Sequence, residues 1–124
     1  MQTVNWENKE ITLIGSGKSV LVFSDEFHMD IFAFMNLFLA QMEKGRMDVN
    51  TVSKLFYTFA KTANDDIFKS YRSFMESVTK IGEFANQDLL IALINIVQDT
   101  MNTGEKSKEA ETDTKKKTTK KKAQ

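Results

Sequence analysis

The sequence of 124 residues contains no cysteine and no proline. The absence of cysteine excludes disulfide bonds and thiolate metal sites, and it agrees with a reducing compartment. The absence of proline means that no helix is interrupted by a residue that lacks a backbone N–H. A single histidine, His28, cannot form a zinc site with several imidazole ligands. Several common metal and redox sites are therefore excluded.

Long apolar runs are also scarce. The longest strongly apolar stretch, Ile31 to Met42, contains Asn36 and Gln41 and is too short to span a bilayer. Residues 1–6 show neither the basic region nor the apolar region of a signal peptide. We therefore expect no association with a membrane.

The formal net charge is zero, but the charges are unevenly distributed. Residues 1–104 carry nine basic and thirteen acidic side chains, whereas residues 105–124 carry eight lysines and four acids. We expect residues 1–104 to form one globular domain. Residues 105–124 are expected to be a disordered lysine-rich tail, because they hold too little apolar surface to offset the entropy of ordering. The acidic body argues against a nucleic-acid-binding domain, because phosphate contacts need a basic face.

The predicted fold class is α+β, with an N-terminal β-hairpin packed on a small bundle of about four α-helices. Two runs of strand-forming residues, Ile11–Ile14 and Ser19–Phe23, are joined by Gly15–Lys18. The two glycines of this connector suit a tight turn. Val4 and Trp6 either add a short third strand or cover the face of the hairpin.

Four helical segments are predicted after the hairpin, each with apolar residues at helical spacing and a capping residue. The first runs from the cap Ser24 to the stop Gly45 and is apolar on more than one face, so we expect it to be central in the core. The other three are predicted to begin at the caps Asp48, Asn64 and Asn86.

One short string looks like part of a phosphate-binding loop. Gly15 to Ser19 reads Gly-Ser-Gly-Lys-Ser, but the full motif also needs a glycine at position 12, which is Thr12 in this chain. The residues that follow are predicted to form a strand and not the helix whose N-terminus would receive the phosphate. We therefore expect a hairpin turn and no nucleotide site.

No other group of residues indicates catalysis or metal binding. The acidic residues around His28 are interpreted as the start of a helix, with His28 partly exposed. The pair Asp65-Asp66 follows the predicted cap Asn64, where acidic residues stabilise a first helical turn. The sequence therefore predicts a protein that is not an enzyme and that binds no cofactor and no metal.

The chain is rich in phenylalanine, with ten residues, and in methionine, with seven. Most of them have core spacing, but the surplus in the first predicted helix is hard to bury in a small domain. These side chains either belong to the core or form an exposed surface that receives a partner helix or a second copy of the chain. The candidate residues for such a surface are Phe32, Leu39, Phe56 and Tyr71.

The predicted tail contains six lysines within eight residues. Such a run binds nucleic acid or anionic lipid without specificity, contacts an acidic partner, or only solubilises the protein. Arginine and aromatic residues that would stack on bases are missing from it. The lysines that are candidates for partner binding are Lys115, Lys116, Lys117, Lys120, Lys121 and Lys122.

As a whole, this layout resembles the tail assembly chaperones of long-tailed bacteriophages, especially those of phages and prophages of Gram-positive hosts. The resemblance covers residues 9–103 in architecture and the tail in composition, and it contains no specific residue motif. It is carried by the predicted hairpin Ile11–Phe23, by Ser24-Asp25-Glu26-Phe27 before the aromatic helix, and by the amphipathic run Thr51–Phe59.

The resemblance implies a non-enzymatic protein in the cytoplasm of the bacterial host. Chaperones of this family coat the tape-measure protein, keep it soluble and help to recruit tail-tube subunits. The implied partners are therefore the tape-measure protein and the tail-tube protein, with self-association as a further expectation. The alternative is a small phage-encoded adaptor or regulatory protein whose basic tail contacts nucleic acid.

Overall fold

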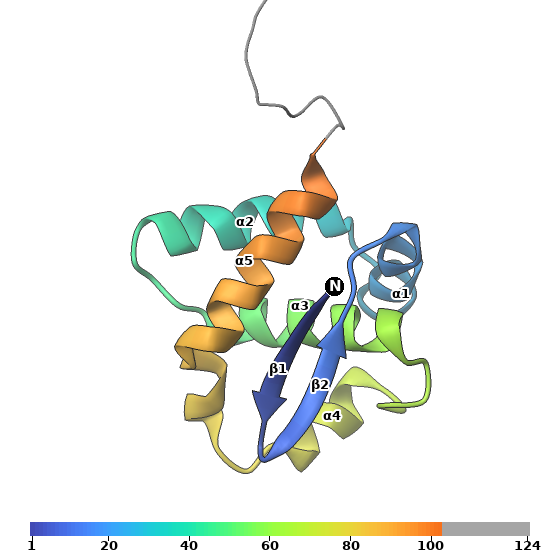
Figure 1. Ribbon diagram of the computed structural model, residues 1–124. Coiled ribbons are helices and arrows are strands. Elements are labelled where there is room, and N and C mark those ends of the chain that lie inside the picture. The colour runs from blue at the N-terminus through green and yellow to red at the C-terminus, as the bar shows by residue number, and fades with distance from the viewer. Residues whose placement is uncertain (103–124) are drawn as a thin grey trace, which may run out of the picture.

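The computed structural model describes residues 1–102 and has the expected α+β fold, with a two-stranded sheet at the N-terminus followed by helices (Figure 1). The predicted lysine-rich tail lies outside the described residues. The elements in chain order are β1 (Gln2–Trp6), β2 (Lys9–Leu13), α1 (Gly17–Phe27), α2 (Ile31–Glu43), α3 (Val49–Ala63), α4 (Tyr71–Ser77), the 3-10 helix η1 (Ile81–Ala85) and α5 (Gln87–Met101).

The hairpin lies earlier in the chain than the sequence predicted. β1 pairs antiparallel with β2, and Val4 is opposite Ile11. The two turn residues, Glu7 and Asn8, both have positive φ angles, of 47° and 68°. A two-residue turn with positive φ at both positions matches the right-handed twist of the strands. Strand formation around Ile11 is thus confirmed, but its partner is β1 and not Ser19–Phe23.

The segment Ser19–Phe23 is helical because a strong helix start precedes it. The Ser16 side chain accepts a hydrogen bond from the backbone N–H of Lys18, and the Ser19 side chain accepts one from the backbone N–H of Ser16. This reciprocal cap provides acceptors for backbone N–H groups at the start of the helix. In a strand, the same N–H groups would need acceptors from a neighbouring strand. The prediction of a strand here was wrong, since the local cap outweighs the β-forming character of the apolar residues.

The first predicted helix is two helices, α1 and α2. α1 ends at His28, whose φ of 55° is left-handed, and the Asp30 side chain caps α2 by accepting from the backbone N–H of Phe32. Ser24, the expected cap, lies inside α1. The apolar spacing continues across the break, so the hydrophobic pattern alone concealed it.

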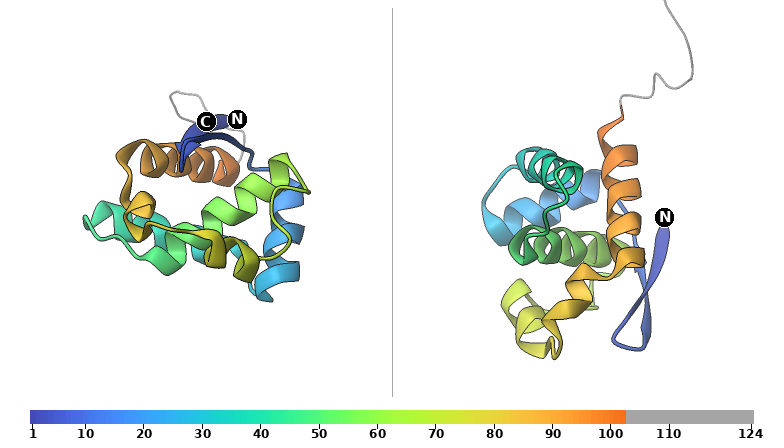
Figure 2. Two further views of the ribbon diagram at one scale, coloured as in Figure 1. Left: turned by 90° about the horizontal axis from the view of Figure 1, so that it is seen from below. Right: turned by 90° about the vertical axis from the view of Figure 1, so that its left-hand side faces the viewer.

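The central helix is α3 and not the aromatic segment that the sequence favoured. Ten of the fifteen residues of α3 are buried, whereas α2 buries only Ile31, Met35 and Phe38. α3 packs beside β2, and α5 packs beside β1, so that these two helices support the hairpin (Figure 2). α2 lies on the far side of α3 and α5 from the hairpin turn (Figure 2).

The caps Asp48 and Asn86 begin α3 and α5 as predicted, and each accepts hydrogen bonds from backbone N–H groups of the first turn. Asn64 does not begin a helix. It ends α3 and is followed by a turn, and α4 begins only after the cap Ser70. Gly82, which lies at the end of the apolar stripe of that predicted helix, is within η1.

A cluster of aromatic rings fastens the hairpin to the helices. The ring centroid of Trp6 lies 4.8 Å from that of Phe56 and 4.8 Å from that of Phe84. Only 6% of Trp6 is exposed, and both phenylalanines are fully buried. Because aromatic pairs contribute beyond the area that they bury, this cluster fixes the position of a hairpin that would be marginal alone.

At Gly15, the connection between β2 and α1 lies in close contact with α5. A Cβ atom on Gly15 would overlap Thr100 Oγ1 and lie 2.7 Å from Ile96 Cγ2, whereas a Cβ on Gly17 meets no described atom within 4 Å. Thr100 and Ile96 are β-branched and cannot turn away freely. We expect Gly15→Ala to lower the free energy of unfolding by about 1–3 kcal/mol.

Gly17→Ala is the matched control for this prediction, and it should leave stability unchanged or raise it by up to about 1 kcal/mol. Urea denaturation followed by circular dichroism measures both variants. Equal stability of the two would contradict the packing of α5 on this connection.

Candidate protein-binding surface

α2 is apolar on the side that faces away from the core as well as on the side that packs against it. Its last residue, Glu43, is the only charged one in the helix. Phe32 is 46% exposed and Leu37 is 45% exposed. A helix that is apolar all round is normally covered on all sides. We call the outward residues the α2 face, and they are Phe32, Ala33, Asn36, Leu37 and Ala40.

Two hollows flank the C-terminal half of α2. One, of about 600 Å³, lies between α2 and α5, and the other, of about 420 Å³, lies beside the connection from α2 to α3. Ala40, whose side chain is a single methyl group, lines both. The first is also lined by Asn36, Leu39, Met42, Glu43, Ile94 and Gln98, and the second by Leu37, Gln41, Lys44, Arg46, Met47 and Asp48. The α2 face and these two hollows together form the α2 surface.

The structure brings two of the four apolar candidates from the sequence to this surface. Phe32 is on the α2 face, and the half-buried Leu39 lines the hollow toward α5. Tyr71 lines neither hollow; it is half-buried on α4, and its hydroxyl forms a 2.7 Å hydrogen bond with the hydroxyl of Ser53. Phe56 has no exposed surface, so it does not contact a partner in this structure.

Sequence reasoning missed Leu37, Ala40 and Ile94. The absence of charge before Glu43 was a usable signal for Leu37 and Ala40, since a solvated helix face normally carries charged residues. Ile94 lies far along the chain and meets α2 only through the packing of α5. The six candidate lysines from Lys115 to Lys122 lie outside the described residues.

The segment that looks like a phosphate-binding loop does open a helix after a strand, which corrects the expected context. Its side chains are nevertheless engaged. Lys18 Nζ lies 2.7 Å from Asp65 Oδ1, and this pair holds the pKa of Asp65 below its usual value. Ser19 is fully buried, and its hydroxyl lies 2.8 Å from that of Thr62. The hydroxyl that would hold the metal ion of a phosphate-binding loop is therefore buried, and the lysine is paired with a carboxylate at the surface.

The remaining titratable candidates do not form a site. His28 is exposed at the end of α1, and within residues 1–102 no three histidine or acidic side chains lie close enough to hold a metal ion. The buried Tyr57 hydroxyl donates a 3.0 Å hydrogen bond to Glu26 Oε1. Burial and this hydrogen bond raise the pKa of Tyr57 well above its usual value, so the phenol stays protonated.

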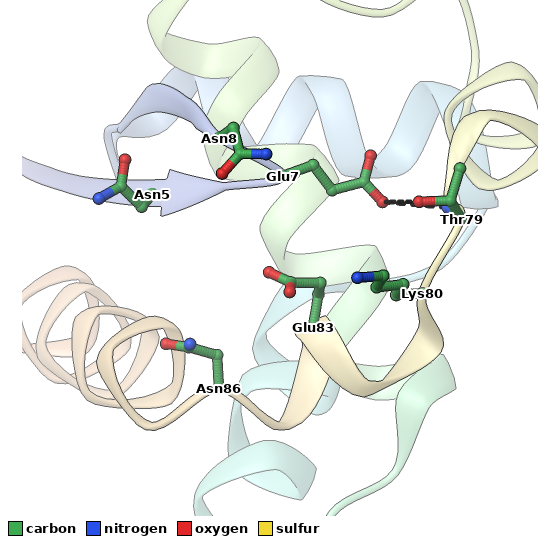
Figure 3. Close-up of a pocket in the computed structure, with 7 residues that line it drawn as sticks. All are labelled: Asn5, Glu7, Asn8, Thr79, Lys80, Glu83 and Asn86. Carbon is green, nitrogen blue, oxygen red and sulfur yellow. Dashed lines mark hydrogen bonds between the residues drawn. The ribbon is translucent and has the colours of Figure 1, made fainter.

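A polar hollow of about 470 Å³ lies between the hairpin turn and η1 (Figure 3). Glu7 Oε2 accepts hydrogen bonds from the backbone N–H of Thr79, at 3.0 Å, and from its hydroxyl, at 3.1 Å. The backbone hydrogen bond is the main reason that the pKa of Glu7 is lowered. This carboxylate ties the hairpin turn to the segment before η1, and we interpret it as a structural link.

Comparison with known protein families, with curated proteins and with solved structures finds no match for this chain. Among residues 1–102, no helix has the length and apolar character needed to cross a membrane. Of the three features that carry the resemblance in layout, only the amphipathic run Thr51–Phe59 keeps its expected structure, because Ser19–Phe23 and Ser24–Phe27 belong to α1. The candidate function consequently depends mainly on the geometry of the α2 surface.

The link through Glu7 makes stability depend on pH. Because its pKa in the folded protein is lower than its ordinary value of 4.5, its contribution is fully present above pH 4.5 and is lost as the pH falls through the folded value. We expect Glu7→Gln to destabilise the protein at pH 7 and to have a smaller effect at pH 3. Glu10→Gln, on the exposed edge of β2, serves as the control. A Glu7→Gln effect of equal size at both pH values in urea titrations would argue against the link.

Proposed function

We propose that this protein is a non-enzymatic chaperone of the phage tail assembly type. In this proposal the α2 surface binds amphipathic helical segments of a tape-measure protein and keeps that protein soluble. The chaperone also helps to recruit tail-tube subunits. The observation that carries the proposal is that no element of residues 1–102 covers the α2 face, where Phe32 and Leu37 are each nearly half exposed.

The shape of the α2 surface suits a helical client. An amphipathic helix docks through apolar residues at positions i, i+3 or i+4, and i+7, which fill hollows in the receiving surface. The two hollows beside Ala40 offer such sites on both flanks of α2. Met42 and Met47 line them, and methionine side chains adapt to clients of varied sequence. Binding of this kind needs no energy source and no catalytic group.

The charges around the surface favour a client that is recognised by its apolar pattern. The α2 face itself is uncharged, and its border carries both signs, with Glu43 beside one hollow and Lys44, Arg46 and Asp48 beside the other. Binding through apolar contacts depends weakly on salt, whereas binding of nucleic acid by a lysine-rich segment falls steeply as salt increases.

A long helical client can be covered by the chaperone even if each single contact is weak. A large side chain such as Phe buries about 150–250 Å² when it is fully enclosed, so a face with two half-exposed large side chains offers on the order of 150–250 Å². One such contact is weak. A tape-measure protein presents many apolar segments, and copies bound side by side would cover it even though each contact is modest.

Substitution of Ala40 provides the direct test. We expect Ala40→Glu to lower the amount of soluble tape-measure protein on co-expression by about tenfold or more, because a buried unpaired carboxylate costs at least ~1.4 kcal/mol. Ala40 is exposed on a helix, so the substitution should not disturb the fold.

Ile81→Glu is the matched control, since Ile81 is 65% exposed on η1 and lines neither hollow. Soluble tape-measure protein should stay at the wild-type level with this variant, both at low and at physiological salt. Equal loss with both variants, or equal retention, would contradict binding through the α2 surface. Recovery of nucleic acid alone, lost with rising salt, would favour the adaptor function instead.

Removal of residues 105–124 separates the two parts of the proposed function. We expect the truncated protein to keep the tape-measure protein soluble, because the α2 surface is unchanged, and to lose recruitment of tube subunits. Co-purification of the tape-measure and tube proteins with each form measures this. Retention of both partners by the truncated protein would contradict a role of the lysine-rich segment in recruitment.

A further inference from the structure

The α2 surface carries both a protruding aromatic side chain and a hollow that would receive one. Phe32 projects from the first turn of α2, and Ala40 lies beside the hollow shared with α5. The two positions are eight residues apart, which is about two turns or 12 Å along the helix. When two copies face each other in opposite directions, Phe32 of each copy can therefore lie opposite the hollow beside Ala40 of the other copy.

We infer that two copies of this chain associate through antiparallel packing of α2 against α2, about a two-fold axis between Asn36 and Leu37. In this arrangement Phe32 of each copy lies over the turn that contains Ala40 of the other copy and enters the hollow of about 600 Å³ beside it. A two-fold interface uses the same patch on both copies, and the α2 face meets that requirement.

The residues at the axis suit this pairing. Leu37 of each copy would meet Leu37 of the other and cover an apolar side chain that is nearly half exposed in the single chain. Asn36 would meet the Asn36 amide of the second copy, and two amides can donate and accept one hydrogen bond each. A single polar residue inside an apolar helix interface fixes its register. Ala33 and Ala40 are small and allow the helices to approach closely.

The charges beyond the apolar residues favour the antiparallel orientation. Asp30 is exposed at the N-terminal end of α2, and Lys44 and Arg46 are exposed beyond its C-terminal end. Antiparallel packing brings Asp30 of one copy to the end that holds Lys44 and Arg46 of the other, and it also opposes the two helix dipoles. Glu43 beside the hollow toward α5, and Asp48 beside the other hollow, offset part of this attraction. Parallel packing would instead place the two Asp30 carboxylates near each other and would align the two helix dipoles.

The area available predicts a weak dimer. With on the order of 150–250 Å² of apolar surface per copy, the contact is smaller than the ~800 Å² per partner of a stable interface. Copies would therefore exchange rapidly, and a client helix would compete for the same surface. The inference rests on the geometry of the α2 surface alone, and its failure would leave the proposed client binding to be judged by its own experiment.

Sedimentation of the full 124-residue chain without any client tests the association. The average mass should rise from monomer toward dimer over about 1 μM to 1 mM. Phe32→Ser and Ala40→Glu should each weaken the association by at least about tenfold, whereas Ile81→Glu should leave it unchanged. Circular dichroism verifies that each variant is folded. A wild-type chain that stays monomeric over the whole range, or a dimer that tolerates both α2 variants, would overturn the inference.

Cross-linking tests the orientation, and the absence of cysteine from the chain makes it specific. Ala33→Cys and Ala40→Cys change exposed small residues that face each other in the antiparallel pair. With a short bis-maleimide, a mixture of the Ala33→Cys and Ala40→Cys variants should give mainly mixed dimers, in which one copy of each variant is linked to the other. Parallel packing would instead link each variant to itself and would contradict the inferred orientation. Asn36→Cys, next to the axis, should link to itself, which shows that the α2 faces meet.

Discussion

Burial of α3 constrains the rest of the structure. Four of its ten buried residues are serine or threonine, and three of their hydroxyls donate to backbone carbonyls one turn earlier in the helix, including Thr58 to Lys54 and Thr62 to Thr58. Such bonds satisfy polar groups without a partner from another element. α3 can therefore be enclosed by the hairpin and by the other helices at once. It occupies the centre of the fold even though α2 is the more apolar helix.

The central position of α3 also determines how α2 is held. Lys54 of α3 places its ammonium group 5.2 Å from the ring centroid of Phe27, 5.5 Å from that of Phe34 and 5.9 Å from that of Tyr71. These rings come from α1, α2 and α4, so one cation contacts three helices. Cation–π contacts of this kind stabilise most when they are partly shielded from water. The N-terminal half of α2 is therefore fixed, and its outward face is a defined part of the fold.

The sequence was informative where a local cap determines the structure. Asp48 and Asn86 each cap a helix as predicted, because the cap is a local contact with the backbone N–H two residues later. The hairpin was placed wrongly because Ser16 and Ser19 form a reciprocal cap that was interpreted as turn chemistry. The break at His28 was missed because the apolar spacing is the same on both sides of it. Apolar residues at helical spacing identify a helix, but they do not show where it is interrupted.

The same limit applies to the candidate site. Phe56 and Phe32 both belong to apolar helical stripes, yet one is fully buried and the other is nearly half exposed. The difference arises from α3, which fills the core, while no element of residues 1–102 covers the far side of α2. Sequence spacing shows that a side chain belongs to a stripe, whereas only the packing of distant elements decides whether that stripe is covered.

The exposure of the α2 face is not required by folding. Leu37 and Ala40 point away from the core, so polar residues there would leave the packing of Ile31, Met35 and Phe38 unchanged. A polar outward face would also lower the risk of nonspecific association that an apolar patch creates. Neither packing nor solubility explains the apolar residues at these positions, and this supports the proposed contact with another helix, from a client or from a second copy.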